Sequence, residues 1–216
     1  MSEKKLSIYM AGPDVFFENA LEIAAQKKDI LERFDLEGHH PFDNNVMTAG
    51  KTQAEIAQNI FTENVAMMDR CDLILANLTP FRGPSADVGT IFEIGYMYAR
   101  QKPIFGYSNI ADEFITRIEA YNKKPLRQDK DGMFWDSDDL NAENFGLRDN
   151  LMIDCAFVDQ AQAITARTEY QGALSQIRDF AASAVPEGEI HGSLKAFKAQ
   201  AQNIARLRDE GLLFLA

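Results

Sequence analysis

Apolar and polar residues are distributed along the chain in a way that predicts a regular succession of strands and helices. The segments 6–11, 71–78 and 102–107 are short, mainly apolar runs, which is typical of buried strands. Between them, apolar residues recur at helical spacing over roughly 14–34, 53–70 and 88–100. Strands and helices that alternate in this way build parallel sheets with helices on both faces.

The pattern therefore predicts an α/β fold with three layers, flavodoxin-like or Rossmann-like, around a mostly parallel central sheet of about five strands. A capping box at Thr52 and Glu55 opens one helix. Asp14 and Asp87 are placed to cap the helices that follow the strands at 6–11 and 71–78, and for Asp87 that role alone would explain the residue. Later parts of the chain predict helices at about 111–122, 167–184 and 193–210, a long ordered loop or flap at 123–150, and a loop-like stretch at 36–51 with an optional edge strand at its start.

The length of 216 residues suits one α/β domain with elaborations. No internal repeat, low-complexity tract or shift in composition marks a boundary within it. We therefore predict a single domain over residues 1–216, with a C-terminal helical extension at about 186–216.

Composition excludes several classes of function. The formal net charge of −11 disfavours non-specific nucleic-acid binding, which needs Lys and Arg to neutralise phosphates. The apolar run after Lys5 is too short for a signal peptide or for a membrane span. Cys71 and Cys155 form no metal-spaced pair, and the three histidines form no HExxH or Cys/His cluster. We expect a cytoplasmic protein that binds neither nucleic acid nor membrane and uses no metal or other cofactor.

The candidate chemistry gathers where the strand at 71–78 leads into the next helix. Ligands of parallel sheets bind beyond the carboxyl ends of the strands, and the Gly/Pro-rich segment Pro80–Tyr96 lies at that edge. We expect Asp72, Asp87 and Glu93 near it, with the Tyr9 hydroxyl in reach of a carboxylate on the neighbouring helix. Retaining glycosyl transfer needs one carboxylate as nucleophile and a second acid for the leaving group, and such a cluster could supply both.

These residues also have purely structural interpretations. Glu93 can cap a loop or pair with Arg82 or Arg100. Asp72 can be an ordinary turn residue at the start of a strand, and Tyr9 can be an aromatic residue packed in the core. The residues taken one at a time leave these alternatives open.

Two stretches and one residue, considered together, indicate a function more specifically than any of them alone: Ile8–Pro13, Asp72 and Asp87–Tyr96. They resemble the nucleoside 2-deoxyribosyltransferase family over roughly residues 6–165. The resemblance implies double-displacement transfer of 2-deoxyribose between purine or pyrimidine bases, with 2′-deoxynucleosides and free nucleobases as partners, in nucleoside salvage. It also implies a homo-oligomer with shared active sites, because in this family a neighbouring subunit completes the site near the sugar 5′-hydroxyl.

The same resemblance implies a role for each matching residue. Glu93 corresponds to the nucleophile that attacks C1′ of the sugar, and Tyr9 to the tyrosine that orients it. Asp72 and Asp87 correspond to the aspartates that contact the base and handle its proton. The remaining substrate contacts that it implies are to the base at Gly12 and Phe16, and from the neighbouring subunit at Asn150 and Asp149.

Two rival functions remain open from the sequence. A 2′-deoxynucleoside 5′-monophosphate N-glycosidase of the same fold family would need a phosphate cradle. The loop at 12–17 offers none and carries an aspartate, although Arg82 with Ser85, or Arg148, could supply one. A non-catalytic nucleoside sensor is the second rival, and a nucleophile paired with a tyrosine argues against it because binding alone needs neither. A redox module of flavodoxin type fits poorly without a phosphate loop.

Overall fold

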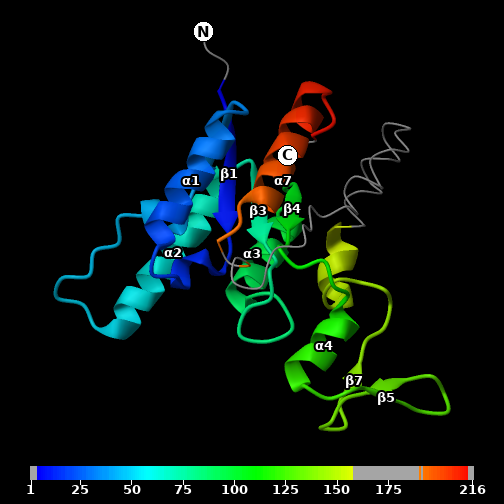
Figure 1. Ribbon diagram of the computed structural model, residues 1–216. Helices are drawn as coiled ribbons and strands as arrows, with labels where there is room; N and C mark the ends of the chain where they lie inside the picture. The colour runs from blue at the N-terminus through cyan, green and yellow to red at the C-terminus, as the bar shows by residue number, and fades with distance from the viewer. Residues whose placement is uncertain (1–3, 158–189, 191, 214–216) are drawn as a thin grey trace.

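The computed structural model describes residues 4–157, 190 and 192–213, and its centre is a parallel sheet (Figure 1). The strand order is β2-β1-β3-β4, and every neighbouring pair is parallel. In chain order the elements are β1 (Leu6–Ala11), η1 (Pro13–Phe16), α1 (Ala20–Glu32), β2 (Leu36–His39), η2 (Pro41–Asp43), α2 (Gln53–Arg70), β3 (Leu73–Asn77), α3 (Val88–Ala99), β4 (Ile104–Tyr107), α4 (Phe114–Asn122), β5 (Arg127–Gln128), β6 (Phe134–Trp135), β7 (Asn141–Ala142) and α7 (Lys195–Asp209). A further helical segment occupies residues 151–157.

Helices cover both faces of the sheet, which confirms the predicted three-layer α/β architecture. Because side chains alternate along a strand, β1 sends Ile8 and Met10 to one face and Tyr9 and Ala11 to the other. The first face packs against α1 and α7, and the second packs against α2, α3 and residues 153–157. The described residues supply four strands of this sheet, where the sequence predicted about five.

Most local signals in the sequence act as predicted. Thr52 and Glu55 form the capping box of α2, and Asp87 caps α3. The optional edge strand at the start of 36–51 is β2. The predicted flap contains a small antiparallel sheet of β5, β6 and β7, and the helix predicted at 167–184 lies outside the described residues.

The C-terminal helix α7 packs directly on the central sheet. Phe197, Ala201 and Ile204 on α7 are fully buried in the cluster that also contains the β1 and β3 side chains of that face. The Gln200 side chain donates a hydrogen bond of 2.7 Å to the carbonyl of Gly106 in β4. The sequence predicted a C-terminal helical extension, and its helix α7 covers one face of the central sheet. The division of the chain into domains stays a prediction.

The sequence predicted that Asp14 caps α1, and this prediction is wrong. It lies in η1, and α1 begins only at Ala20, after Asn19. The Asp14 carboxylate instead forms a buried ion pair with Lys27 of α1. Lys27 is only 2% exposed because its stem enters the core and its ammonium lies 5.3 Å from the ring centre of Phe197.

Replacing Lys27 by alanine is expected to lower the free energy of unfolding by about 3–5 kcal/mol, because it leaves the Asp14 carboxylate buried without its cation. The matched control is Lys28→Ala, one residue along, which removes a half-exposed pair with Asp43 and should cost about 1 kcal/mol or less. Urea denaturation followed by circular dichroism measures both. Equal losses in the two variants would contradict a special role for the buried pair.

Candidate active site

The loops after β1 and β3 meet at the carboxyl edge of the sheet. A Cβ atom added to Gly12 would lie 2.7 Å from the Asn77 Cβ atom, so the close approach of the two loops requires glycine there. Asn77, the last residue of β3, donates from its side chain to Asp14 at 3.2 Å and accepts from the Thr79 hydroxyl at 2.6 Å. A buried polar network therefore fixes the floor of the edge where ligands of parallel sheets bind.

Tyr9 and Glu93 form the central contact of this edge. Tyr9 is fully buried in β1, and its hydroxyl donates a hydrogen bond of 2.5 Å to Glu93 Oε1 on α3. Burial raises the pKa of Glu93 to about 7, while the bond from Tyr9 opposes that rise and the nearby Asp87 carboxylate adds to it. Burial, followed by the adjacent Glu93 charge, raises the pKa of Tyr9, so its phenol remains a hydrogen-bond donor.

The position of Glu93 follows from the register of α3. Thr90, Ile94 and Met97 are the buried residues of this helix, and Glu93 lies three residues after the first and four before the last. Residues at this spacing share one face of a helix, so Glu93 is on the stripe that packs against the sheet. The burial that raises its pKa is therefore built into the sequence.

Asp87 combines a structural role with a free oxygen atom. Its Oδ2 atom accepts hydrogen bonds from the Thr90 backbone N–H at 2.9 Å and the Thr90 hydroxyl at 3.0 Å, which fixes the first turn of α3. Among the described residues, Oδ1 has no hydrogen-bond donor. The cap thus holds a carboxylate close enough to Glu93 to raise the pKa of that residue.

An aromatic group with a cation lies on the same edge. Phe16 in η1 and Phe81 after β3 are stacked, with ring centres 5.2 Å apart and planes 12° from parallel. The guanidinium carbon of Arg82 lies 4.9 Å from the first ring centre and 4.8 Å from the second. The sequence singled out Phe16, but nothing in it paired that residue with Phe81, because the contact joins two loops 65 positions apart.

The two proposed partners of Glu93 are engaged elsewhere. Arg82 stacks on the aromatic rings, and Arg100 forms an ion pair of 3.2 Å with Asp69. Within the described parts of the chain, neither arginine pairs with Glu93. The interpretation of Glu93 as half of a surface ion pair is therefore wrong.

Asp72 is not brought together with Glu93, and its predicted placement at the carboxyl edge is wrong. It precedes β3, so it lies at the amino end of the strand, opposite Gly12 and Asp87. Its Oδ2 atom accepts bonds from the Ser7 backbone N–H at 2.8 Å and the Ser7 hydroxyl at 2.6 Å. Since parallel strands share their polarity, a residue at the start of β3 cannot reach the edge where β3 ends.

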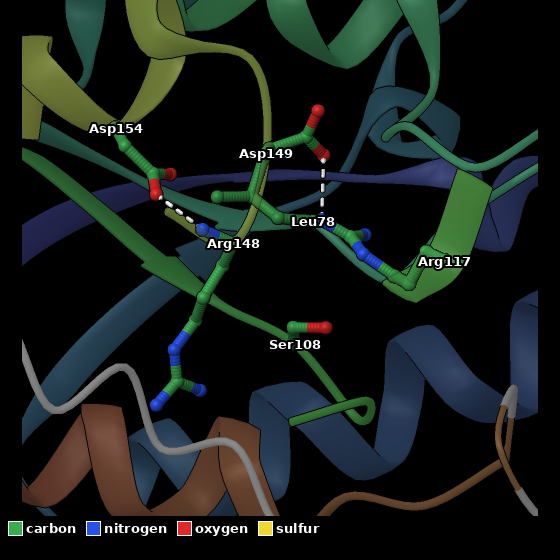
Figure 2. A pocket seen from close by; sticks show the side chains of 6 residues that line it. All are labelled: Leu78, Ser108, Arg117, Arg148, Asp149 and Asp154. Carbon is green, nitrogen blue, oxygen red and sulfur yellow. Dashed lines mark hydrogen bonds and ion pairs between the residues drawn. The ribbon is translucent and has the colours of Figure 1, made fainter. Parts of the chain in front are cut away.

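Asp149 and Asn150 contact other groups than Glu93. Asp149 is 3% exposed; its carboxylate accepts from the Ser85 hydroxyl and from the Ala86 N–H at 3.0 Å, and it pairs with Arg117 at 3.6 Å (Figure 2). It thereby ties the loop before α3 to α4. The Asn150 side-chain amide donates to Glu143 at 2.9 Å. Neither residue forms a hydrogen bond with Tyr9 or Glu93 within this chain.

The described residues contain neither a metal-binding cluster nor a membrane-spanning helix. No three His, Cys, Asp or Glu side chains there gather closely enough to hold a metal ion. None of the helices described is both long and apolar enough to cross a bilayer.

The sequence model of one protein family, nucleoside 2-deoxyribosyltransferase, matches residues 8–152. The chain belongs to this family. The match begins just before Tyr9, includes Gly12, Asp87 and Glu93, and ends before α7. Membership supports a transferase of the deoxyribosyltransferase type.

Two relatives illustrate the match. The 2-desoxiribosyltransferase from Leishmania mexicana has a similar solved structure, with a TM-score of 0.53 and 30% identity over 68% of this chain and 85% of that one. An uncharacterized protein of Schizosaccharomyces pombe is 32% identical over 158 residues, which cover 67% of this chain and 74% of the relative. The first relative is similar to this chain in structure as well as in sequence. The second is uncharacterized and gives no information about function.

The pKa of the Glu93 carboxyl is expected near 7 in a ¹³C NMR titration of the side-chain carboxyl groups, with the resonance assigned by its loss in Glu93→Gln. Tyr9→Phe should move this pKa upward, because it removes the donor that stabilises the ionised form. Tyr121→Phe, at an exposed tyrosine on α4, serves as the control and should leave it unchanged. A Glu93 pKa near 4.5 in the unmodified protein would show that the carboxyl is not desolvated.

Proposed function

We propose that the protein is a nucleoside 2-deoxyribosyltransferase that exchanges the base of 2′-deoxynucleosides through a covalent ester on Glu93. The contact between the Tyr9 hydroxyl and the half-buried Glu93 carboxyl carries this proposal. It holds one carboxylate oxygen and leaves the other for attack, at a site where the pKa keeps a large share of Glu93 ionised at neutral pH. The biological role would be nucleoside salvage in the cytoplasm.

In the first half-reaction the Glu93 carboxylate forms a bond to C1′ of the sugar. The bond between C1′ and the base nitrogen breaks, and its electron pair leaves with the base. Positive charge that develops at C1′ is stabilised by the adjacent carboxylate, and a 2-deoxy sugar develops it more easily because it lacks the 2′-hydroxyl. Asp87, whose Oδ1 atom carries no bond within the described residues, is our candidate for the group that passes a proton to the departing base, and it must carry that proton when the first half-reaction begins.

In the second half-reaction a nitrogen atom of a free base attacks C1′ and displaces Glu93 as a carboxylate. The proton lost by the incoming base returns to Asp87, so the protein ends in its starting state. Tyr9 donates to the Glu93 carboxylate before attack and after release, and thus stabilises it as a leaving group. Exchange outcompetes hydrolysis only if water is kept from the ester.

The hydrogen-bond donors of the loop before α3 are already used within the protein, which favours a nucleoside over a 5′-monophosphate as the substrate. A phosphate cradle would use the Ser85 hydroxyl and the Ala86 N–H, but both donate to the Asp149 carboxylate. The chain therefore places its own anion where a phosphate would bind. This supports the transferase over the N-glycosidase of the same fold family.

A second copy of the chain is part of the proposal. Exposed apolar side chains gather on α2 and α3, where Phe61 and Phe92 lie 5.9 Å apart between ring centres and Val88 is 84% exposed. Such a face is suited to contact between subunits. We propose a homo-oligomer built through this face, in which Asn150 of a neighbouring subunit approaches the sugar 5′-hydroxyl.

Replacement of Glu93 by alanine should abolish base exchange, by at least about 10³-fold, because no other carboxylate is held at the same position. The measurement is chromatography of 2′-deoxyinosine incubated with adenine, in which 2′-deoxyadenosine is the product. Glu113→Ala, an exposed glutamate before α4 without a side-chain cap bond, is the matched control and should retain full exchange.

The same assay separates the rival functions. Release of free deoxyribose at one rate with and without adenine would indicate a hydrolase, and turnover of 5′-monophosphates alone would indicate the N-glycosidase. Full exchange by Glu93→Ala would contradict the mechanism. No reaction by the unmodified protein with any nucleoside or nucleotide would favour the sensor.

Phe92→Asp should dissociate the oligomer and reduce exchange, because it places a charge in the proposed apolar contact between subunits. Light scattering after size-exclusion chromatography measures the mass, with Leu140→Asp as a control at another exposed apolar residue, just before β7. A Phe92→Asp protein of unchanged mass would exclude this face as the interface, and full exchange by a monomer would exclude shared sites.

A further inference from the structure

Arg82 carries hydrogen-bond donors that the protein does not use. Its guanidinium stacks against Phe16 and Phe81, yet it makes no hydrogen bond or ion pair with any described residue. The residue is exposed, and its φ of 56° lies in the left-handed region that a non-glycine residue seldom adopts. A cation held in an unfavourable backbone conformation, with aromatic contacts but no hydrogen-bond acceptor among the described residues, points to a ligand.

The surrounding loop fixes where this cation points. The Phe81 N–H donates to the Ser85 carbonyl at 3.0 Å, which closes the loop of residues 81–85 that contains Arg82. Asp149 then anchors Ser85 and Ala86 from the other side of the loop. The guanidinium carbon lies 4.9 Å and 4.8 Å from the two ring centres, so the rings restrict the positions that this side chain can adopt.

Arg82 also lies on the edge that holds the reacting groups. It is in the loop between β3 and α3, five residues before Asp87 and eleven before Glu93. Phe16, the ring beneath it, is four residues after Gly12 in the loop that follows Tyr9 and β1. The stack therefore joins the loop of Phe16, a base contact that the family resemblance implies, to the loop that leads to Asp87 and Glu93.

The geometry points to a preference for 6-oxopurines, and we propose that Arg82 selects hypoxanthine and guanine by donating two hydrogen bonds to O6 and N7 of the base. This inference rests on the proposed function. A guanidinium presents two parallel N–H donors, and O6 and N7 of a 6-oxopurine are two adjacent acceptors at matching separation. Adenine presents an amino donor in place of O6, so one N–H of Arg82 would face another donor.

The same contact assists departure of the base. When the bond from C1′ to N9 breaks, the electron pair moves into the purine ring, and negative charge spreads to N7 and O6. A permanent cation at those atoms stabilises the transition state more than the neutral nucleoside. Arg82 would then raise the rate of the first half-reaction more for 6-oxopurine nucleosides, which offer both acceptors, than for adenine nucleosides, which offer N7 alone.

A single-turnover experiment tests this, with protein in excess over 2′-deoxyinosine or 2′-deoxyadenosine and no acceptor base. The second-order rate of base release is measured by rapid quench, and mass spectrometry measures the deoxyribosyl ester on the protein. Arg82→Gln should slow release from 2′-deoxyinosine about 10- to 100-fold and from 2′-deoxyadenosine less than about 3-fold. The rate of release from 2′-deoxyinosine by Arg82→Lys should lie between those of the unmodified protein and Arg82→Gln, since lysine keeps the charge and loses the paired donors.

Arg127→Gln is the matched control, because Arg127 also stacks on an aromatic ring, that of Trp135 in the small sheet, and should leave both rates unchanged. Equal slowing of the two substrates by Arg82→Gln would overturn the inference, as would an unmodified protein that releases both bases at the same rate. Absence of base release and of ester with either nucleoside would instead contradict the proposed function itself.

Discussion

The desolvated carboxyl of Glu93, held by the Tyr9 hydroxyl, is the contact on which the rest of the site depends. It joins the central strand β1 to α3, so the sheet and the helix must pack in one register for it to form. An ionisable group on a buried helical face lowers stability unless its charged form is hydrogen-bonded, and Tyr9 provides that bond. Chemistry and folding therefore depend on the same pair of side chains.

Much of the fold was predictable because its signals are local. The alternation in β1, the capping box at Thr52 and Glu55, and the Asp87 cap each depend on residues within a few positions of one another. Glu93 was identifiable as well, since a carboxylate on an otherwise apolar helical face stands out by its spacing. Motif resemblance then supplied its partner Tyr9, which the structure places against it.

Prediction from sequence fails where partners are distant along the chain or where strand polarity decides the edge at which a residue lies. Asp14 was assigned to the nearest helix start, but its charge is balanced by Lys27, a lysine whose burial depends on aromatic rings from β4 and α7. Asp72 was placed by proximity in sequence to the loop, although a strand of five residues separates it from that edge. The stack of Phe16, Phe81 and Arg82 joins two loops and leaves no periodic signal at all.

The burial of Lys27 has a consequence for the order of events during synthesis. Its ammonium lies between Asp14, near the N-terminus, and Phe197, near the C-terminus. On the ribosome, the first strands and α1 emerge long before α7 is translated, so one wall around this cation is missing until α7 has left the exit tunnel. The loop that carries Gly12 and Asp14 thus acquires its final support last, and a nascent chain without α7 has an unfinished site although the segment containing Glu93 is already synthesised.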